Sequence, residues 1–408
     1  MNSKRIVIAG GGAAGFFAAL ACAETAPGAE IFIFEKSSQF LAKVKISGGG
    51  RCNVTHAEFD PREFSKRYPR GERALISAFA KFQARDTVAW FENRDVELKA
   101  ESDGRMFPVT DSSQTIIDCL LNSARRAGIK LKTNCGVETV SKKSGGGFEL
   151  TLSHGEQLSC DKLLLATGGC RTPALGQLAV SLGHQLEPPV PSLFTFHVAT
   201  PWLRTLAGIS VERVEASVPE SKLRETGALL ITHWGLSGPA ILRLSAWGAR
   251  ELHAKNYTFP LQINWLPDFN NEMVAAELQT RRNSQPAKLV VNSPIAPLPA
   301  RLWEQLVLAA GLEATLRWSD LSRAGQHQLI QQLLRAEFPV TGKSLNKDEF
   351  VTCGGVKLSE VNFKTMESKI CPGLFFAGEV LDIDGITGGF NFQSAWTTGW
   401  LAGKAMAA

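Results

Sequence analysis

The stretch Ile6-Val7-Ile8-Ala9-Gly10-Gly11-Gly12-Ala13-Ala14-Gly15 decides how the first part of the chain folds. Four apolar residues predict a buried strand, the glycines predict a tight turn, and the alanine-rich run after them predicts a helix. In this pattern Gly10 makes the turn, Gly12 lets backbone N–H groups approach a pyrophosphate, and Gly15 lets the helix pack closely on the strand. The positive end of the helix would face the phosphates. The stretch therefore predicts a nucleotide-binding β-α-β unit.

A second apolar run, residues 31–34, ends at Glu35, twenty residues after Gly15. An acid at this distance can accept hydrogen bonds from the ribose of a dinucleotide. A glycine motif alone also fits an ordinary strand–helix turn. The strand, the helix and the acid together favour a dinucleotide site.

Composition limits the class of protein. The chain has 408 residues, 44% of them hydrophobic and 20% charged, which predicts a globular protein of two or three domains. Its formal charge of +5 gives little support to a nucleic-acid partner. No apolar run is long enough for a membrane helix, and Lys4-Arg5 lead straight into the first strand, so we expect neither a membrane partner nor a signal peptide.

The eight cysteines are scattered and form no CxxC pair. This predicts no metal site and no disulfide framework, and it favours a reducing cytoplasmic location. The missing CxxC also argues against a dithiol–disulfide reductase. Such enzymes pass electrons through a cysteine pair.

The pattern along the chain predicts a domain with a long insertion. Strand and helix signals alternate over residues 1–190 and stop at a proline-rich run, residues 188–191. Residues 191–270 carry short strand signals, and residues 271–340 form a helical subdomain. Residues 341–408 end the insertion and return to strand signals that complete the first domain. Within that domain, residues 37–60 are predicted to be a loop and residues 72–92 a helix.

A second informative stretch runs from Gly378-Glu379 to Gln393. A strand ends in the glycine–acid pair, and the turn Gly388-Gly389 opens a helix of small and aromatic residues. Glu379 can accept hydrogen bonds from a sugar-alcohol chain, and the helix N-terminus can stabilise negative charge on the pyrimidine edge of a reduced flavin. This pairing favours FAD over NAD. The alternative is a last strand with its packing helix.

A third stretch is Ser47-Gly48-Gly49-Gly50-Arg51-Cys52-Asn53-Val54-Thr55. Its glycines allow close approach to a planar ring or a phosphate. Arg51 and Lys43 can neutralise negative charge, and Asn53 offers both a donor and an acceptor. Cys52 could act as a nucleophile activated by His56, four residues away. The alternative is that Cys52 is a small buried residue.

Together with residues 104–109, 166–169, 232–239 and 365–369, these stretches resemble the BaiN/YhiN-like flavoprotein family, also called aminoacetone-oxidase-family FAD-binding enzymes. The resemblance spans nearly the whole chain. It implies an α/β fold: a Rossmann-like, glutathione-reductase-like FAD-binding domain with an inserted β-barrel-like domain and a small helical subdomain. It also places the FAD contacts on a set of residues shared by the three stretches and the segments between them: Gly12, Ala13, Ala14, Glu35, Lys36, Lys43, Arg51, Cys52, Asn53, Val137, Thr167, Gly168, Glu379, Gly389, Phe390, Asn391 and Gln393.

The expected function is that of an FAD-dependent oxidoreductase, an enzyme that transfers hydride through flavin N5. One branch is NAD(P)H-linked reduction of an unsaturated or carbonyl-conjugated small molecule, and the other is O₂-using oxidation of a small amine. Because no second GxGxxG follows, NAD(P)H would dock only transiently as electron donor. A rival of another class is an RNA-modifying or redox-sensing flavoprotein. The catalytic residue stays open among Cys52, His56 and His233, and His233 is more readily explained as a polar residue at a domain seam.

Overall fold

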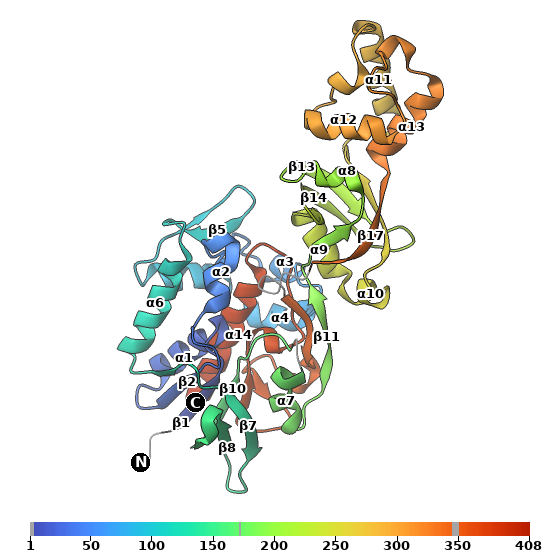
Figure 1. The fold of residues 1–408 in the computed structure, drawn as a ribbon. Coiled ribbons are helices and arrows are strands. Elements are labelled where there is room, and N and C mark those ends of the chain that lie inside the picture. Colours follow the sequence, from blue (N-terminus) through green and yellow to red (C-terminus); the bar gives the residue numbers. More distant parts are fainter. Residues whose placement is uncertain (1–3, 171–172, 345–350) are drawn as a thin grey trace. The chain divides into compact units, whose positions relative to one another are not determined.

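The computed structural model describes residues 4–170, 173–344 and 351–408 (Figure 1). The chain forms two compact units. The first unit combines Met1–Ser192 with Asn346–Ala408, and the inserted unit comprises Leu193–Leu345.

A seven-stranded sheet forms the centre of the first unit, in the order β19-β20-β21-β10-β1-β2-β6. Strand β1 pairs in parallel with β10 on one side and β2 on the other. Its residues Ile6, Val7 and Ile8 have no exposed surface, as expected of a strand covered on both faces. The strand bounds are β1 (Arg5–Ala9), β2 (Glu30–Phe34), β6 (Lys130–Lys132), β10 (Lys162–Leu165), β19 (Val361–Asn362), β20 (Glu367–Ser368) and β21 (Leu374–Phe376). The predicted β-α-β unit is confirmed.

Helices α1 (Ala13–Thr25) and α14 (Phe390–Ala407) pack together although they come from opposite ends of the chain (Figure 1). Glycines allow the close approach. A Cβ atom at Gly399 would clash with the Ala14 carbonyl oxygen, and one at Gly403 would clash with that of Ala18. The C-terminal segment therefore completes the domain that the N-terminal strand begins.

Two local predictions in this unit are corrected by the structure. Residues 37–60 are not only a loop, because they contain helix α2 (Ala42–Gly50) and strand β3 (Thr55–His56). Residues 72–92 form two helices, α4 (Glu72–Phe79) and α5 (Ala84–Glu92), instead of one. The break has a local cause: Gln83 is extended, and its N–H donates to the Asp86 carboxylate at 2.8 Å, which starts a new helix.

Smaller elements complete the first unit. Strands β3, β5 (Arg105–Pro108) and β4 (Leu98–Ala100) form one antiparallel sheet, and β7 (Val137–Lys142), β8 (Phe148–Leu152) and β9 (Gln157–Cys160) form another. Strand β11 (Leu186–Ser192) pairs with β18 (Val351–Val356), so the two strands that flank the insertion are neighbours. Helices α3 (Pro61–Ser65), α6 (Ser113–Arg126) and α7 (Pro173–Ser181) lie between these strands in sequence.

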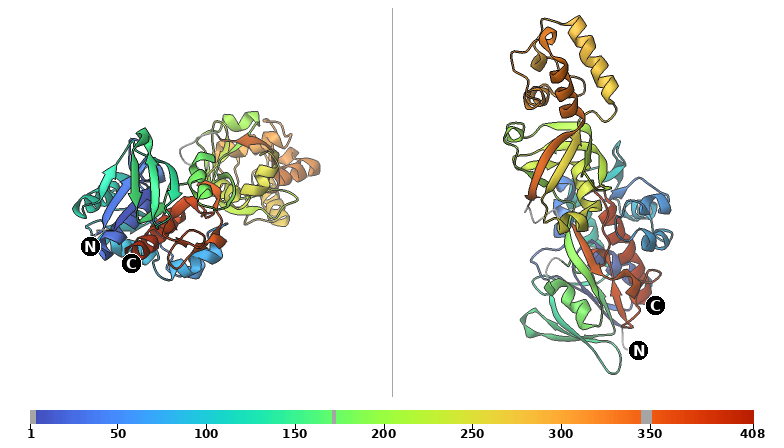
Figure 2. Two further views of the ribbon diagram at one scale, coloured as in Figure 1. Left: turned by 90° about the horizontal axis from the view of Figure 1, so that it is seen from below. Right: turned by 90° about the vertical axis from the view of Figure 1, so that its right-hand side faces the viewer.

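The inserted unit contains a closed barrel in the order β12-β15-β14-β13-β16-β17. Three helices inserted between β16 and β17 lie beyond one end of the barrel (Figure 2). Trp303 and Trp318 are fully buried among them, which gives this subdomain an apolar centre of its own. The bounds are β12 (Phe196–Val198), α8 (Pro201–Arg204), β13 (Ser210–Ser217), β14 (Arg224–Ile231), β15 (Gly235–Ser237), α9 (Pro239–Trp247), α10 (Ala249–Ala254), β16 (Phe259–Asn264), α11 (Asn271–Ser284), α12 (Ala300–Ala309), α13 (Arg323–Leu334) and β17 (Ala336–Lys343).

Within the described ranges, every helix is too short or too polar to cross a bilayer. Among the same residues, no group of three His, Cys, Asp or Glu side chains could hold a metal ion.

Candidate functional site

The glycine turn after β1 has the geometry of a phosphate cradle. Gly10 has a φ of +116°, and a Cβ atom there would clash with the Ala166 carbonyl oxygen. A Cβ atom at Gly15 would clash with the Gly10 oxygen, so both positions require glycine. Gly12 is the N-cap of α1, and the first N–H groups of the helix have no partner within it. This end of α1 can therefore receive a pyrophosphate.

Glu35 supports the turn from the end of β2. Its Oε2 accepts a hydrogen bond from the Gly11 N–H at 2.9 Å, and its Oε1 accepts one from the Ser37 N–H at 2.8 Å. A carboxylate has further acceptor positions for a ribose hydroxyl. Glu35 thus has a structural role in addition to the ribose contact that its position in the sequence predicts.

The returning C-terminal segment brings Glu379 to the same region. Glu379 Oε1 accepts from the Thr352 N–H at 2.8 Å, and Oε2 forms an ion pair with Lys43. Gly169, which follows the expected contacts Thr167 and Gly168, lies against this carboxylate, since a Cβ atom there would be 2.7 Å from Oε1. Residues that are far apart in the sequence therefore meet around Glu379.

Two buried hydroxyls, one of them next to this carboxylate, fit a polar ligand. The Oγ1 atoms of Thr167 and Thr352 are buried and have no hydrogen-bond partner among the residues that the structure describes. Buried hydroxyls in proteins are nearly always hydrogen-bonded, and a ligand rich in hydroxyls and phosphate oxygens could satisfy them. With the glycine cradle and Glu35, they make this donor and acceptor set suitable for FAD.

The glycine loop at the end of α2 leaves helical geometry. Gly48, Gly49 and Gly50 all have positive φ, and Cβ atoms at Gly49 and Gly50 would meet nothing within 4 Å. The loop therefore offers open backbone that a planar ring could approach. Cys52, two residues after Gly50, has no exposed surface, and burial raises the pKa of its thiol to about 12. A protonated, buried thiol is a poor nucleophile.

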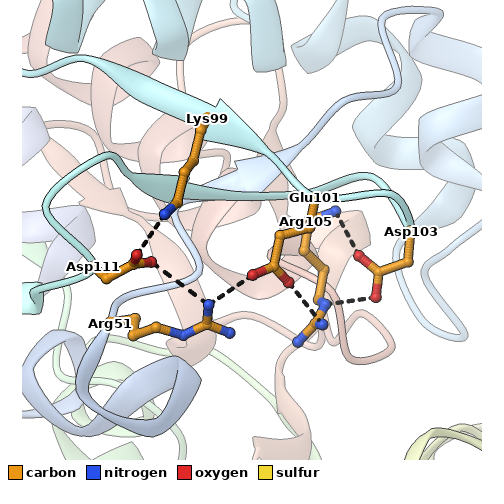
Figure 3. A network of polar contacts seen from close by, with 6 residues as sticks. All are labelled: Arg51, Lys99, Glu101, Asp103, Arg105 and Asp111. Atoms are coloured by element: carbon orange, nitrogen blue, oxygen red, sulfur yellow. Dashed lines mark hydrogen bonds and ion pairs between the residues drawn. The ribbon is translucent and has the colours of Figure 1, made fainter.

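Arg51 binds carboxylates of the protein itself. Its Nη1 donates to Glu101 Oε1 at 2.6 Å and lies 3.6 Å from Asp111 Oδ1, and its guanidinium lies 3.9 Å from the centre of the Phe107 ring. Glu101 also accepts from Arg105 at 2.9 Å. These contacts fasten the glycine loop to strands β4 and β5 through a network that further includes Lys99 and Asp103 (Figure 3). Sequence reasoning missed the network because its acids lie 50 or more residues from Arg51.

Asn53 and Gln393 connect the glycine loop to the start of α14. With its amide oriented to satisfy both groups, Asn53 donates to the Thr55 oxygen at 3.1 Å and accepts from the Gly389 N–H at 3.0 Å. Gln393 Oε1 accepts from Thr55 Oγ1 at 2.6 Å, and Gln393 Nε2 donates to Thr397 at 3.1 Å. Gln393 is completely buried. Its side chain therefore positions the backbone around Gly389.

Asn391 and His56 hold the turn before α14. Asn391 exchanges two 2.8 Å hydrogen bonds with the backbone of Gly385. The His56 ring stacks on Phe390 at 4.7 Å, and its Nδ1 donates to the Gly388 oxygen at 3.1 Å. Burial lowers the pKa of His56, which favours the neutral ring.

The remaining predicted site residues, Val137, Lys36 and His233, lie in two separate places. Cys135 donates its N–H to the Glu35 oxygen at 2.9 Å, which brings Val137 and Lys36 near the end of β2. His233 is exposed and lies in the inserted unit, between β14 and β15.

A buried ion pair that sequence reasoning missed holds the C-terminal motif. Asp384 has no exposed surface, pairs with Arg70 and accepts from Ser192 Oγ at 2.6 Å. Burial raises the pKa of this carboxyl, and the Arg70 charge opposes the shift. Ser192 is the last residue before the insertion, so the pair ties the motif to the point where the chain leaves the first unit.

Comparison with known proteins gives a consistent result. A family model described as the HI0933-like protein Rossmann domain matches residues 4–405. The 3-dehydro-bile acid delta(4,6)-reductase of Clostridium scindens is 30% identical, over 99% of this chain and 99% of its own. The ribosomal RNA dihydrouridine synthase of Escherichia coli is 32% identical, over 97% of this chain and 96% of its own.

Among solved structures, 3-ketosteroid delta1-dehydrogenase from Sterolibacterium denitrificans aligns over 100% of both chains, with a TM-score of 0.54 and 11% identity. At this identity the likeness shows a shared fold alone. The expected Rossmann-type architecture with an inserted closed barrel is confirmed.

Proposed function

The chain belongs to the HI0933-like Rossmann family of FAD-dependent oxidoreductases, and from this premise we propose that it reduces a carbon–carbon double bond conjugated to a carbonyl, with NAD(P)H as the electron donor. One observation carries the proposal. Two enzymes similar to this chain along nearly its whole length have names that denote the same bond chemistry.

The two names share that chemistry although their substrates differ in size. A 3-dehydro bile acid with double bonds at positions 4 and 6 is an enone system. Dihydrouridine is uridine whose ring double bond, conjugated to a carbonyl, has been reduced. In both cases a hydride equivalent adds to the carbon β to the carbonyl and a proton adds to the α carbon. NAD(P)H supplies the hydride equivalent and is oxidised to NAD(P)⁺.

The residues of the first unit support such a reaction. Bound FAD supplies the hydride chemistry between donor and substrate. In the proposal, the N-terminus of α1 and Glu35 hold the ADP half of the cofactor. The N-terminus of α14, fixed by Asn53 and Gln393, can stabilise negative charge at a nearby ring edge.

Two of the candidate acid–base residues, Cys52 and His56, are occupied by the packing of the first unit. Cys52 has no exposed surface, and its thiol holds its proton tightly. His56 already uses Nδ1 to bind Gly388, and its ring packs on Phe390. His233 is exposed and lies on the turn between β14 and β15 of the inserted unit.

A uracil base in RNA is the substrate class that the Escherichia coli relative supports, and a small enone is the class that the Clostridium scindens relative supports. The formal charge of +5 gives little support to a nucleic-acid partner. The relative named as an RNA enzyme makes RNA an equal candidate.

An anaerobic titration tests the proposal. Purified flavin-containing protein is mixed with NADPH or NADH, and the absorbance of the oxidised flavin is followed. We expect the absorbance to fall with at least one donor and to return when an α,β-unsaturated ketone or a uridine-containing RNA is added. No loss with either donor would contradict the NAD(P)H-linked reaction.

A further inference from the structure

We propose that Trp234 and His197, on the barrel of the inserted unit, form a stacking platform for an unpaired base of an RNA substrate. The platform consists of the turn between β14 and β15 and the neighbouring strand β12. The inference rests on the proposed function in one respect, because it selects RNA from the two substrate classes named there.

The exposure of Trp234 is the first observation. Its side chain is 69% exposed, whereas Trp265, Trp303, Trp318 and Trp396 are fully buried. Removing an aromatic side chain from water is favourable by a few kcal/mol, so an indole kept in water forgoes that stabilisation. Tryptophan is enriched at binding interfaces, where its ring supplies a large apolar contact area.

The turn that carries Trp234 is firmly held. Thr232 Oγ1 accepts from the Trp234 N–H at 3.3 Å and from the Gly235 N–H at 3.1 Å. The Trp234 oxygen accepts from the Val198 N–H at 3.1 Å. Gly235 has a φ of +150°, and a Cβ atom there would clash with the Phe196 oxygen. The backbone is therefore fixed while the indole stays exposed, which lowers the entropic cost of binding.

A second ring extends the surface. His197 lies on β12 between the buried residues Phe196 and Val198, so its side chain points to the outer face of the strand. Its ring is within 20° of parallel to the Trp234 ring, with the centroids 6.4 Å apart. The exposed His233 adjoins Trp234 in the turn. Parallel rings of this kind suit flat aromatic ligands.

An RNA base fits this surface better than a small enone. Small ligands are usually enclosed, with most of their surface buried in a pocket, and an indole exposed to this extent is not enclosed. Unpaired RNA bases are commonly taken up on exposed aromatic rings, and the neighbouring nucleotides cover what the protein leaves open. The net charge of +5 does not oppose a polyanion.

The test measures binding of a fluorescein-labelled oligouridylate to the flavin-containing protein by anisotropy over a series of salt concentrations. Trp234→Ala should weaken binding about ten-fold or more, because base–aromatic stacking is lost. Trp234→Phe should retain most of the affinity. The slope of log K against log salt should stay at the wild-type value in both variants, since no phosphate contact is removed.

Trp247→Ala is the matched control. Among the described residues of the inserted unit, Trp247 is the second exposed tryptophan, 41% exposed at the end of α9. Its loss should leave RNA binding unchanged. The platform is refuted if Trp234→Ala binds like the wild type, if both tryptophan variants lose affinity equally, or if the wild type does not bind the oligouridylate. It is also refuted if Trp234→Ala impairs only the reduction of a small enone.

Reduction of the bound flavin by NAD(P)H, measured on the same samples, separates this inference from the proposed function. We expect Trp234→Ala to be reduced at the wild-type rate. If the oligouridylate binds in a Trp234-dependent way and no double bond is reduced, the proposed function fails while the platform stands. If enones are reduced and RNA is not bound, the platform fails while the proposed function stands.

Discussion

The hydroxyl of Thr55 donates a hydrogen bond to Oε1 of Gln393 across 2.6 Å, between two side chains that have no exposed surface. This bond joins the glycine loop near the N-terminus to the start of α14. It continues through Gln393 Nε2 to Thr397, whose hydroxyl donates to the Phe82 oxygen at 2.9 Å. The position of Gly389, and with it the N-terminus of α14, depends on this buried chain of hydrogen bonds.

Replacing Thr55 with Val should destabilise the protein and weaken FAD binding. The variant keeps the shape of the side chain and leaves Gln393 Oε1 buried without a donor, which costs about 1–3 kcal/mol. Urea unfolding and the flavin retained after dialysis measure the two effects. Thr280→Val is the control, because its exposed hydroxyl bonds only within its own helix. Equal stability of Thr55→Val and wild type would contradict the structural role of the bond.

Substituting Ala for Gly399 should separate α14 from α1. The added Cβ clashes with the Ala14 carbonyl oxygen, and crowding of this kind costs about 1–3 kcal/mol. Because α1 starts at the phosphate cradle, we also expect faster loss of FAD. Thermal unfolding with and without added FAD measures both. Gly145→Ala, where a Cβ atom meets nothing within 4 Å, should be neutral. A neutral Gly399→Ala would mean that the helices tolerate a larger separation.

His184 should make the stability depend on pH. Its side chain is buried, its Nδ1 lies 2.8 Å from Glu360 Oε2, and its Nε2 lies 2.8 Å from Ser368 Oγ. Ser368 Oγ already accepts two backbone N–H groups, so the neutral ring, accepting at Nε2, fits the network. Burial lowers the pKa of His184, and Glu360 opposes this shift.

The direction of the pH dependence of stability follows from this lowered pKa. The folded state binds the proton less readily than the unfolded chain, so the stabilising contribution is complete above the ordinary histidine pKa of about 6.5 and is lost as the pH falls below it. The loss is at most about 1.4 kcal/mol per pH unit. Urea unfolding of wild type and His184→Gln between neutral and mildly acidic pH measures it, with the exposed His327→Gln as control. The free energy of unfolding should depend less on pH in His184→Gln, whereas His327→Gln should behave like the wild type. An unchanged pH dependence in His184→Gln would argue against a neutral buried ring.

Arg51 should act on FAD binding through Glu101. If it positions the glycine loop, Arg51→Ala and Glu101→Gln should each weaken FAD binding about two- to five-fold, the range for a partly exposed ion pair. The double variant should then be little worse than either single one. Calorimetric titration of the flavin-free protein with FAD measures all three. A much larger, additive loss in Arg51→Ala would indicate a direct contact with the cofactor.

The sequence allowed prediction of those parts of the site whose chemistry is local. Gly10, Gly15 and Glu35 follow from the order of strand, turn, helix and acid; the structure puts both glycines where only glycine fits and Glu35 beside the turn, where it accepts from the Gly11 N–H. Glu379 and Gly389 follow from a second strand–turn–helix pattern. By contrast, Glu101, Thr352 and Arg70 reach the site through pairings between distant strands and loops. The spacing of residues in the sequence does not predict such pairings.

The same reason explains two residues whose surroundings differ from the simplest expectation. The sequence predicts that Arg51 neutralises the negative charge of a pyrophosphate or a reduced flavin, and in the structure Arg51 also binds the acids of a neighbouring hairpin, whose register was not predictable. Cys52, for which the sequence leaves a nucleophile and a small buried residue as alternatives, is fully buried at a positive φ of 63°. Its burial depends on the complete packing around β3 and β5, which sequence patterns do not describe.

The most direct test of the central claim is the transfer of hydrogen from NAD(P)H to a conjugated double bond without oxygen. The enzyme, anaerobic NADPH or NADH, and either an enone or a uridine-containing RNA are incubated together, and the product is analysed by mass spectrometry. We predict a product that has gained two hydrogen atoms. When the donor carries deuterium at its transferable position, the product should contain one deuterium. An unchanged substrate, together with donor consumption only when oxygen is admitted, would contradict the account and indicate an oxidase.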